Sequence, residues 1–445
     1  MAIADHTFLH TTLFSDLSKW SATDAVFTNA KNRYPLVPLS KVLKRVKEPV
    51  IIEDDVLYKR ITVRLYGKGI IQRDEAFGKE IGTKRQFVAH AGQLILSRID
   101  ARNGAFGIVP LELEGAIVTN DFWLFEVQNA LPEYLMVVLS SEHFQKYWQT
   151  QSSGTTNRQR VSENSFLNTR IVLPTFQEQT KLIEEYQNTM KEAAKNEEAA
   201  DSLQISLNHS ITNILGVSYN STVLNGLISQ VNFSFLSRWD PLYLENRVVV
   251  KSKYPMVTLS RVIKGFLVDS TGESLRRNTK AEEDRTYQYI GMEDIEKNTG
   301  KRTLKEVRGH EILSQTFLVP RGYIIYGKLR PYLNKYWENT TDENIICSSE
   351  FFVFNTVGIE REYFLTIIAS EIIQRQLPPL YSGARMPRIT EDVFLDLQIP
   401  LPVESVQIEI ISLSRRIRNE IDALRQSANV SRLTAKMAFE TAVFG

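Results

Sequence analysis

The stretch RYPLVPLSKVLK, residues 33–44, returns almost unchanged as KYPMVTLSRVIK at residues 253–264. Seven of the twelve positions are identical, and others exchange similar side chains, such as Leu36 for Met256. Each copy contains Tyr-Pro, and a residue that precedes proline prefers extended backbone. A phrase that recurs about 220 residues further along one chain indicates an internal duplication. We therefore expect each copy to open one of two similarly folded halves.

Six further pairs of segments repeat in the same order and support this duplication. Their offset drifts only between 219 and 230 residues, as small insertions would produce. Written first half and then second half, the pairs are LSKW 17–20 and LSRW 236–239, GQLILSRID 92–100 and GYIIYGKLR 322–330, AIVTNDFWLF 116–125 and IICSSEFFVF 345–354, EYLMVVLSSE 133–142 and EYFLTIIASE 362–371, SGTTNRQRVSENSF 153–166 and SGARMPRITEDVF 382–394, and IVLPTFQEQ 171–179 and IPLPVESVQ 399–407. The chain is thus predicted to be a tandem repeat.

Within each half, the same kinds of element are predicted in the same order. The apolar runs that follow Gly92 and Gly322 are short, rich in β-branched or aromatic residues, and typical of strands. FWLFEV and FFVFNT are also strand-like. The segments that begin EYLM and EYFL instead carry apolar residues at helical spacing, as at Leu135, Val138 and Leu139. Each half is therefore expected to contain a mixed α/β domain, and the fold class is α+β.

Each half ends in a segment that is predicted to form one long helix. After Pro174, and again after Pro402, the chain continues for about 40 residues without glycine or proline. At 1.5 Å per residue, each helix is about 60 Å long. Apolar residues at seven-residue spacing mark one narrow stripe on each helix, formed by Ala193, Ala200, Leu207 and Ile214 and by Ile410, Ile417 and Leu424.

A stripe this narrow does not stabilise an isolated helix, so each long helix is expected to have a helical partner. The other long helix is the obvious one, and the duplication favours an antiparallel coiled coil with pseudo-twofold symmetry. The alternative is that each helix packs separately as a core helix. The predicted organisation is a mixed domain at residues 1–174, a long helix at 175–215, a second mixed domain at 216–402 and a second long helix at 403–445.

The bulk properties exclude several classes of protein. A chain of 445 residues is too long for one ordinary core. No apolar run approaches the roughly 20 residues needed to cross a bilayer, and the N-terminus lacks the basic and apolar blocks of an export signal. The single cysteine, Cys347, excludes an internal disulfide framework and fits a reducing compartment. We expect a cytoplasmic protein.

The net charge of +1 hides an uneven distribution along the chain. Residues 31–110 contain 16 Lys and Arg against 8 Asp and Glu, and residues 301–337 contain 8 against 2. Residues 176–215, in the first long helix, reverse the sign with 3 against 7. Two basic regions indicate two places that could meet phosphate, although solvated protein faces would give the same counts.

The sequence offers little catalytic equipment. There is no GxxxxGK[ST] loop for ATP hydrolysis and no Asn-Pro-Pro-aromatic or Asp-Pro-Pro-aromatic motif for methyl transfer to an amino group. LPPLY at 377–381 lacks the acidic or amide residue such a motif needs. NGAFG at 103–107 is predicted to be a turn, Cys347 is expected to fill a buried strand, and the six histidines form no zinc-binding pair. These absences favour a non-catalytic protein without a metal site.

Cationic side chains gather instead in loops at matching places in the two halves. Arginine can form bidentate hydrogen bonds with guanine or phosphate, and asparagine can read adenine. Ser162 and Thr390 are predicted to start short helices beside these loops. For any single arginine, a solvated or salt-bridged role is equally open. The candidate DNA-binding residues are Lys84, Arg85, Arg98, Arg102, Asn157, Arg158, Arg160, Lys328, Arg330, Arg385 and Arg388.

This layout resembles the specificity (S) subunit of a Type I restriction–modification enzyme. The resemblance spans nearly the whole chain and rests on the doubled opening phrase and on the closing pattern SG…R(V/I)(S/T)…F…(I/V)xLP…Q before each long helix. The second copy departs from the pattern at VESVQ, where the Gln-Glu-Gln start of the first helix is not repeated, but Gln407 still aligns with Gln179. The individual motifs are loose, whereas their doubled order is specific.

The resemblance implies a non-catalytic DNA-binding subunit. Two target-recognition domains would each bind one half of a split, asymmetric target, and the paired helices would set the distance between the halves. Two modification (adenine methyltransferase) subunits and two restriction (translocase and nuclease) subunits would assemble around it on double-stranded DNA. S-adenosylmethionine, ATP and Mg are then expected on those partner subunits, with no cofactor bound by this chain.

Three alternatives remain open at this stage. The chain could belong to a related system in which methylation and cleavage lie on other chains or were lost. It could be a duplicated carbohydrate- or peptide-binding protein with a structural coiled coil, in which case Trp123 and Trp148 would be candidate aromatic platforms. It could also be a methyltransferase of unusual motif, which would bind S-adenosylmethionine by itself.

Overall fold

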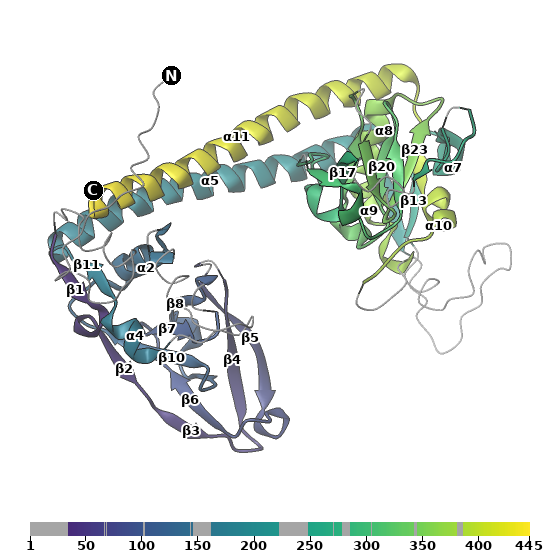
Figure 1. Cartoon of the computed structure of the whole chain (residues 1–445). Helices are drawn as coiled ribbons and strands as arrows, with labels where there is room; N and C mark the ends of the chain where they lie inside the picture. The colour runs from purple at the N-terminus through teal and green to yellow at the C-terminus, as the bar shows by residue number, and fades with distance from the viewer. Residues whose placement is uncertain are drawn as a thin grey trace. The chain divides into compact units, whose positions relative to one another are not determined.

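The computed structural model describes the chain in two compact units. The described residues are 34–65, 67, 69–100, 103–142, 144–145, 162–221, 248–269, 271–277, 285–303, 305–341, 345–380 and 386–445. Unit 1 comprises residues 1–197 with 425–445, and unit 2 comprises residues 198–424. Each long helix therefore contributes one part to each unit (Figure 1).

Unit 1 is built on two sheets and one strand pair. Its strands are β1 (Leu36–Pro38), β2 (Leu43–Val46), β3 (Pro49–Ile51), β4 (Leu57–Val63), β5 (Ile70–Phe77), β6 (Arg85–Ala89), β7 (Leu94–Ser97), β8 (Phe106–Ile108), β9 (Ala116–Val118), β10 (Phe122–Val127) and β11 (Arg170–Val172). Its helices are the short 3-10 turns η2 (Leu39–Lys41), η3 (Gly78–Glu80) and η5 (Leu111–Leu113), then α2 (Pro132–Ser140), α4 (Glu163–Asn168) and the first part of α5 (Phe176–Leu215).

Unit 2 contains the corresponding strands and one additional strand pair, β12-β13. Its strands are β12 (Ser218–Ser221), β13 (Val248–Lys251), β14 (Met256–Thr258), β15 (Ile263–Lys264), β16 (Arg276–Arg277), β17 (Thr286–Ile290), β18 (Glu306–Arg308), β19 (Thr316–Val319), β20 (Ile324–Gly327), β21 (Tyr336–Glu338), β22 (Ile345–Ser348), β23 (Phe351–Thr356) and β24 (Gln398–Pro400). Its helices are α7 (Leu259–Val262), η8 (Met292–Asp294), η9 (Gly309–Glu311), η10 (Pro331–Leu333), α8 (Arg361–Ile368), α9 (Glu371–Gln374), η11 (Pro378–Leu380), α10 (Glu391–Asp396) and the first part of α11 (Glu404–Phe444). The rest of α5 also belongs to unit 2, and the rest of α11 belongs to unit 1.

The strand order repeats between the units, sheet by sheet. The four-stranded sheet β2-β10-β7-β8 has the order of β15-β23-β20-β21, and the five-stranded sheet β3-β6-β9-β4-β5 has the order of β16-β19-β22-β17-β18. The strand pair β1-β11 likewise matches β14-β24. Even the single parallel pairing falls at the same place, between β4 and β9 in unit 1 and between β17 and β22 in unit 2. The duplication predicted from sequence and the mixed α/β fold class are both confirmed.

The opening phrase of each half forms the strand that closes its unit. Leu36 in β1 pairs with Val172 in β11, and Met256 in β14 pairs with Pro400 in β24. These short strands bring the beginning of each domain beside the segment that leads into its long helix. A buried tyrosine strengthens each junction. The hydroxyl of Tyr134 donates a 2.8 Å hydrogen bond to the Val172 carbonyl in unit 1, and that of Tyr363 donates one of the same length to the Pro400 carbonyl in unit 2.

Within unit 1, α5 and α11 pack against each other in antiparallel orientation. The ring of Tyr186 lies 5.9 Å from that of Phe439, and Asn196 Nδ2 donates to Ser427 Oγ at 3.2 Å. Residue numbers therefore rise along α5 while they fall along α11. The buried Ala193 belongs to the predicted heptad stripe. Pairing of the two long helices, as predicted from sequence, is confirmed.

Within unit 2 the remaining parts of the same helices pack in the same sense. Ala200 and Leu207 of α5 share a buried cluster with Ile410 and Ile417 of α11. The heptad positions thus meet each other, as a coiled-coil seam requires. The reading in which each helix packs separately in a core is wrong, because these apolar stripes are buried against one another as well as against the sheets.

A buried glutamine at the start of each long helix ties the helix to its domain. Gln179 accepts a hydrogen bond from the backbone N–H of Leu131 at 2.8 Å and donates to the carbonyl of Pro174 at 2.8 Å. Gln407 makes the same two contacts with Glu360 N at 2.9 Å and Pro402 O at 2.9 Å. The match between the two glutamines in the sequence is therefore a match in structure.

Replacing Gln179 with leucine is expected to lower the free energy of unfolding by about 2–4 kcal/mol, because two buried backbone groups lose their partners. Gln179 is only 1% exposed, so water cannot replace the amide without rearrangement. Urea unfolding of the full chain would measure the change. Gln177→Leu, at an exposed position two residues earlier, is the matched control. Equal losses of unfolding free energy in both variants would contradict a stabilising role for the two hydrogen bonds of Gln179.

The helix that follows β10 or β23 in each unit ends earlier than the helical spacing of apolar residues in the sequence predicts. α2 ends at Ser140, and α8 ends at Ile368 before a second short helix, α9, begins. In unit 2 the cause is Ser370, whose hydroxyl accepts a hydrogen bond from Ile372 N and caps the new helix. None of the described helices combines the length and apolar character needed to cross a membrane.

Candidate nucleic-acid interface

The loop cluster at the end of β20 contains three of the predicted cationic residues. Lys328 follows the last residue of β20, and its backbone N–H donates to the Glu350 carbonyl at 2.8 Å. Its ammonium group donates to the Ser349 carbonyl at 2.8 Å and lies 5.0 Å from the centroid of the Phe352 ring. This half-buried position lowers the pKa of Lys328 through desolvation. The contacts fix the loop between β22 and β23 to the end of β20.

Arg98 occupies the same place in unit 1. Its backbone N–H donates to the Asp121 carbonyl at 2.8 Å, and its guanidinium donates to the Asn120 carbonyl at 3.3 Å. The guanidinium carbon lies 5.5 Å from the centroid of the Trp123 ring. A cation, two loop carbonyls and an aromatic ring thus recur at equivalent positions in both units.

Arg388 is brought into the same cluster from the chain segment before α10. Its Nε and Nη2 atoms donate to the two oxygens of Glu350 at 3.0 and 2.9 Å, which is a bidentate ion pair. This side-chain hydrogen bonding raises the pKa of Arg388. Sequence reasoning missed Glu350 because it weighed only cations, although the signal was available: Asp121 aligns with Glu350, and Arg160 aligns with Arg388.

Arg330 completes the cluster, and its backbone is in the left-handed region. Its φ is 48° and its ψ is 60°, which is uncommon for a residue other than glycine. The Arg330 N–H donates to the Pro387 carbonyl at 2.7 Å, and residues Leu329 and Arg388 form an isolated antiparallel bridge. The side chain is exposed. The structure therefore brings Lys328, Arg330 and Arg388, three of the candidate residues, together in one loop cluster.

Lys84 and Arg85 lie elsewhere, on the five-stranded sheet of unit 1. Lys84 pairs with Asp54 and also donates to the Gly78 carbonyl at 2.8 Å, so it links the start of β6 to η3 and to the loop between β3 and β4. Arg85 is the first residue of β6 and has an exposed side chain. The corresponding sheet of unit 2 has the exposed pair Arg276 and Arg277 on its edge strand β16. Arg276 and Arg277 are not among the candidate residues predicted from the sequence.

Five of the predicted site residues lie outside the described part of the chain. They are Arg102, Asn157, Arg158, Arg160 and Arg385. The short helices predicted beside two of these segments are present. α4 begins after Ser162, whose hydroxyl accepts from Ser165 N at 3.0 Å, and α10 begins after Thr390.

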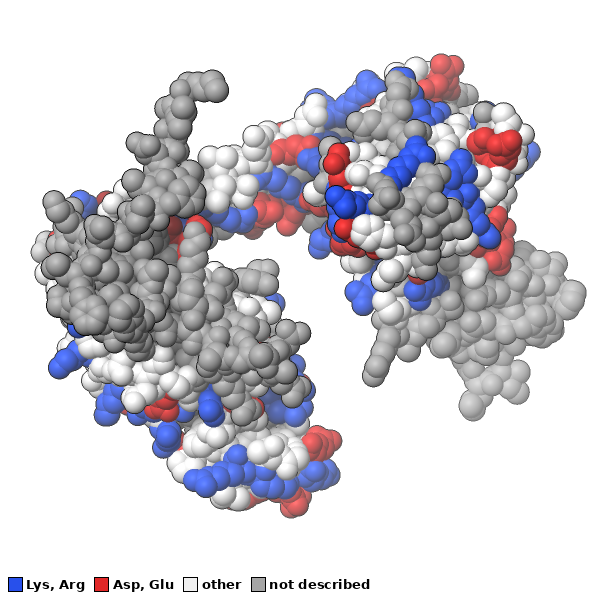
Figure 2. Space-filling view, viewed as in Figure 1, with Lys and Arg blue, Asp and Glu red and all other residues white. Residues whose placement is uncertain are grey.

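The visible face of each unit carries side chains of both charges (Figure 2). Figure 2 shows Lys and Arg side chains on the visible face of each unit, with Asp and Glu side chains among them. Among the described residues, no group of three or more His, Cys, Asp and Glu side chains gathers in a way that could hold a metal ion. Cys347 is buried in β22, and burial raises its thiol pKa, as expected of a packing residue.

The aromatic platforms proposed for a carbohydrate-binding protein do not receive support from Trp123. This side chain is only 3% exposed and packs on Phe166 at a ring distance of 6.2 Å. It belongs to the core of unit 1 and offers no exposed face on which a sugar could stack. Trp148 lies outside the described residues.

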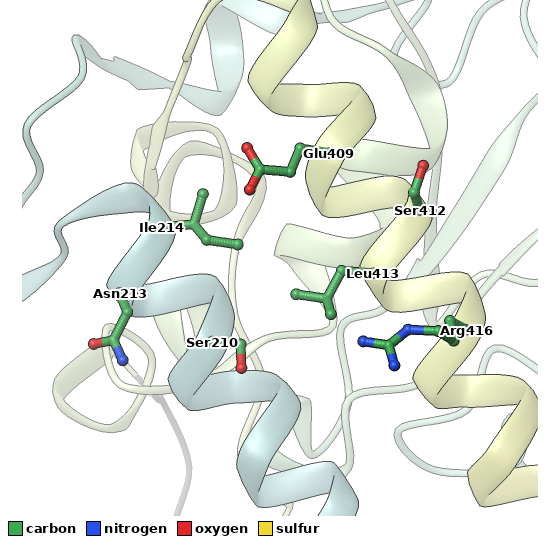
Figure 3. Close-up of a pocket in the computed structure, with 7 residues that line it drawn as sticks. All are labelled: Ser210, Asn213, Ile214, Glu409, Ser412, Leu413 and Arg416. Atoms are coloured by element: carbon green, nitrogen blue, oxygen red, sulfur yellow. The ribbon is translucent and has the colours of Figure 1, made fainter.

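A groove of about 650 Å³ lies between α5 and α11 within unit 2 (Figure 3). It is lined by Ser210, Asn213, Ile214, Glu409, Ser412, Leu413 and Arg416. Figure 3 shows the side chains of Ile214 and Leu413 between the two helices, with Glu409 and Arg416 on α11 to either side of Leu413. The lining mixes apolar, polar and oppositely charged groups and contains no nucleophile paired with a base.

His90 forms the centre of a charged cluster at one corner of unit 1. Its Nδ1 lies 2.6 Å from Glu114 Oε1, and its Nε2 lies 2.8 Å from Glu48 Oε2. These hydrogen bonds, first with Glu114 and then with Glu48, raise the pKa of His90 above 6.5. The doubly protonated imidazole can donate to both carboxylates and so links two loops.

The His90 cluster makes a pH-dependent contribution to stability. Because the folded-state pKa is raised, this contribution is complete below the unfolded-state value of about 6.5 and is lost as pH rises through the folded-state pKa. The stability difference between the wild-type chain and His90→Gln is therefore expected to shrink between pH 6 and pH 9. Urea midpoints across this range measure it, with the exposed His209→Gln as control. A stability difference that stays constant with pH would show that protonation of His90 does not stabilise the fold.

The fold is similar to solved structures of type I restriction–modification (R-M) proteins. One is a chain from work on complex assembly and conformational transition of the type I R-M system, at 15% identity and a TM-score of 0.49, covering 92% of this chain and 96% of that chain. A second is the HsdS subunit from Thermoanaerobacter tengcongensis, at 15% identity and a TM-score of 0.36, with the same coverage of 92% and 96%. A third is the type I restriction–modification S subunit from M. genitalium, at 10% identity and a TM-score of 0.41, covering 94% and 97%.

Comparison with protein-family models and with curated proteins gives no match.

Proposed function

We propose that this chain is the non-catalytic, sequence-specific DNA-binding subunit of a Type I restriction–modification complex. In this role, target-recognition domains at residues 1–174 and 216–402 each bind one half of a split, asymmetric target. The observation that carries the proposal is the repeated topology. The two domains have the same strand order, and each places a cation on loop carbonyls at the end of an equivalent strand, Arg98 after β7 and Lys328 after β20. A single chain with two such readers suits a target with two different halves.

The matching loop clusters support DNA as the ligand. Short loops on a rigid sheet can present arginine side chains to a groove of DNA. Arg98 and Lys328 anchor these loops through carbonyl contacts, so the loops are held in place before any ligand binds. Exposed cations such as Arg330 then remain on the surface near the anchor. An arrangement of this kind favours recognition over catalysis.

The helix pair supports a scaffolding role for partner subunits. Ile205 on α5 is 59% exposed, and Leu433 on α11 is 53% exposed. The two residues hold equivalent positions, because each lies 26 residues after the buried glutamine of its own helix, Gln179 or Gln407. Exposed apolar side chains on a helix are typical docking points for other proteins. Equivalent positions on two helices would serve two copies of one subunit.

In the proposed complex, the helices at 175–215 and 403–445 set the distance between the recognition domains. Two modification subunits and two restriction subunits bind around the chain, and they carry S-adenosylmethionine, ATP and Mg. The chain itself supplies DNA recognition and docking surfaces. Its location in the proposal is the cytoplasm, where DNA and these partners are accessible.

A selection experiment on the full-length chain tests the proposal. The chain is incubated with a library of randomised DNA duplexes, and the bound duplexes are sequenced over several rounds. The expected result is enrichment of two short specified blocks of different sequence separated by a gap of constant length. Enrichment of one continuous block, or of no sequence, would refute the bipartite reader. Binding of S-adenosylmethionine by the isolated chain would instead favour a methyltransferase.

A further inference from the structure

The backbone at Arg330 is held more tightly than its surface location requires. Its N–H donates to the Pro387 carbonyl, its own carbonyl accepts from Leu333 N at 2.8 Å, and Pro331 follows it directly. A non-glycine residue in the left-handed region persists only where surrounding structure imposes it, and such positions cluster at functional sites. The Cα of Arg330 is therefore fixed in register against the segment that carries Arg388.

The neighbouring cations are engaged in contacts that hold the loops. Lys328 is half-buried and donates to the Ser349 carbonyl, and Arg388 is in a bidentate pair with Glu350. Arg330 differs from both, because its guanidinium is exposed and makes no hydrogen bond or ion pair with the described residues. Of these three cations, Arg330 has the side chain that can reach a ligand without breaking a contact that organises the loop.

The equivalent position in unit 1 carries the opposite charge. Asp100 aligns with Arg330, since Gly92 and Gly322 start the two matching segments. The backbone of Asp100 closes a comparable turn, in which its carbonyl accepts from Asn103 N at 2.9 Å. This carbonyl contact is thus shared by both units, whereas the left-handed backbone and the positive side chain belong to Arg330 alone.

This difference in charge separates two kinds of DNA contact. Phosphates are present along every duplex, so a phosphate contact would be expected to keep a positive charge in both units. A position that is arginine in one unit and aspartate in the other suits a feature that differs between two half-targets. Base edges are such a feature, and arginine pairs in bidentate fashion with O6 and N7 of guanine in the major groove.

We propose that Arg330 is a base-reading residue that selects guanine at one position of the half-target bound by unit 2. This inference rests on the proposed DNA-binding function and adds to it the assignment of one side chain to base recognition. Fixed backbone geometry is what such a reader needs, because a bidentate contact requires placement to within a fraction of an ångström.

Selection from randomised duplexes with the full-length wild-type chain and with Arg330→Gln tests the assignment. The expected result is that one guanine in one block loses its preference by about 5- to 150-fold, the range for one bidentate base contact, while the other block is unchanged. Lys297→Gln removes the same charge from an exposed turn of unit 2 and serves as the control. Matching urea midpoints for both variants verify that folding is intact.

Two results would overturn the assignment. If Arg330→Gln weakens all sequences equally and reduces the salt slope of binding by about one, Arg330 contacts a phosphate. If preference and affinity are both unchanged, Arg330 does not contact DNA. Failure of the proposed function is distinguishable from either result, because the wild-type chain itself would then enrich no pair of sequence blocks. That outcome would overturn the assignment of Arg330 as well.

Discussion

Removing seven residues from each long helix is expected to shorten the gap between the two half-targets. The deletions are residues 192–198 in α5 and 425–431 in α11, which are opposite each other in the antiparallel register marked by Asn196 and Ser427. Seven residues preserve the heptad phase and remove about 10 Å of helix. At 3.4 Å per base pair, the gap is expected to shrink by up to about three base pairs. Duplex selection, or the methylated sites of cells that carry the complete system, would measure it.

The control for this experiment keeps the length and changes the residues. Exposed positions within 192–198 and 425–431 are replaced by other helix-forming residues, while the buried Ala193 and Ala428 are retained. This variant is expected to select the wild-type gap. A shortened chain that still selects the original gap would show that the helices do not set the spacing. A chain that binds neither gap would have lost coiled-coil pairing, which thermal melting of its helical signal reports.

The fold was predictable from the sequence because duplication supplies an internal comparison. Segments that match over the whole chain, such as the stretches around Tyr134 and Tyr363, proved to occupy the same place in two equivalent sheets and helices. The long helices were predictable for a different reason. Their lack of glycine and proline and their seven-residue apolar spacing both have one structural interpretation, and Leu207 and Ile417 are buried as that interpretation requires.

The candidate site was predictable only in part. Repetition singled out matching loops in the two halves, and in unit 2 the structure brings Lys328, Arg330 and Arg388 together. Repetition did not reveal which of these cations bind to other groups of the protein. The carbonyl of Ser349 and the carboxylate of Glu350 come close to Lys328 and Arg388 only once the sheet has folded. A count of basic residues cannot separate a cation that anchors a loop from one that faces a ligand. That distinction depends on burial and partners, which only tertiary structure provides.

An aromatic cluster packs α10 of unit 2 against the four-stranded sheet. Phe394 in α10 is fully buried and stacks on Tyr326 of β20 and Phe352 of β23, at ring distances of 5.0 and 4.9 Å. Phe166 does the same in unit 1, where it packs on Phe125 at 5.4 Å. The phenylalanine of the closing sequence motif therefore packs the short helix, α4 or α10, against the four-stranded sheet of its unit.

Replacing Phe394 with alanine is expected to lower the free energy of unfolding by about 3–5 kcal/mol, because a buried ring is lost and a cavity remains. Urea unfolding would measure this loss. Leu313→Ala, at a position that is 82% exposed in the same unit, is expected to change stability by less than about 0.5 kcal/mol. The Phe394 variant should also lose the block of the target that unit 2 reads, because α10 directly follows the segment that holds Arg388 and the Arg330 turn. Retention of both blocks, despite the lost stability, would show that recognition does not depend on this aromatic anchor.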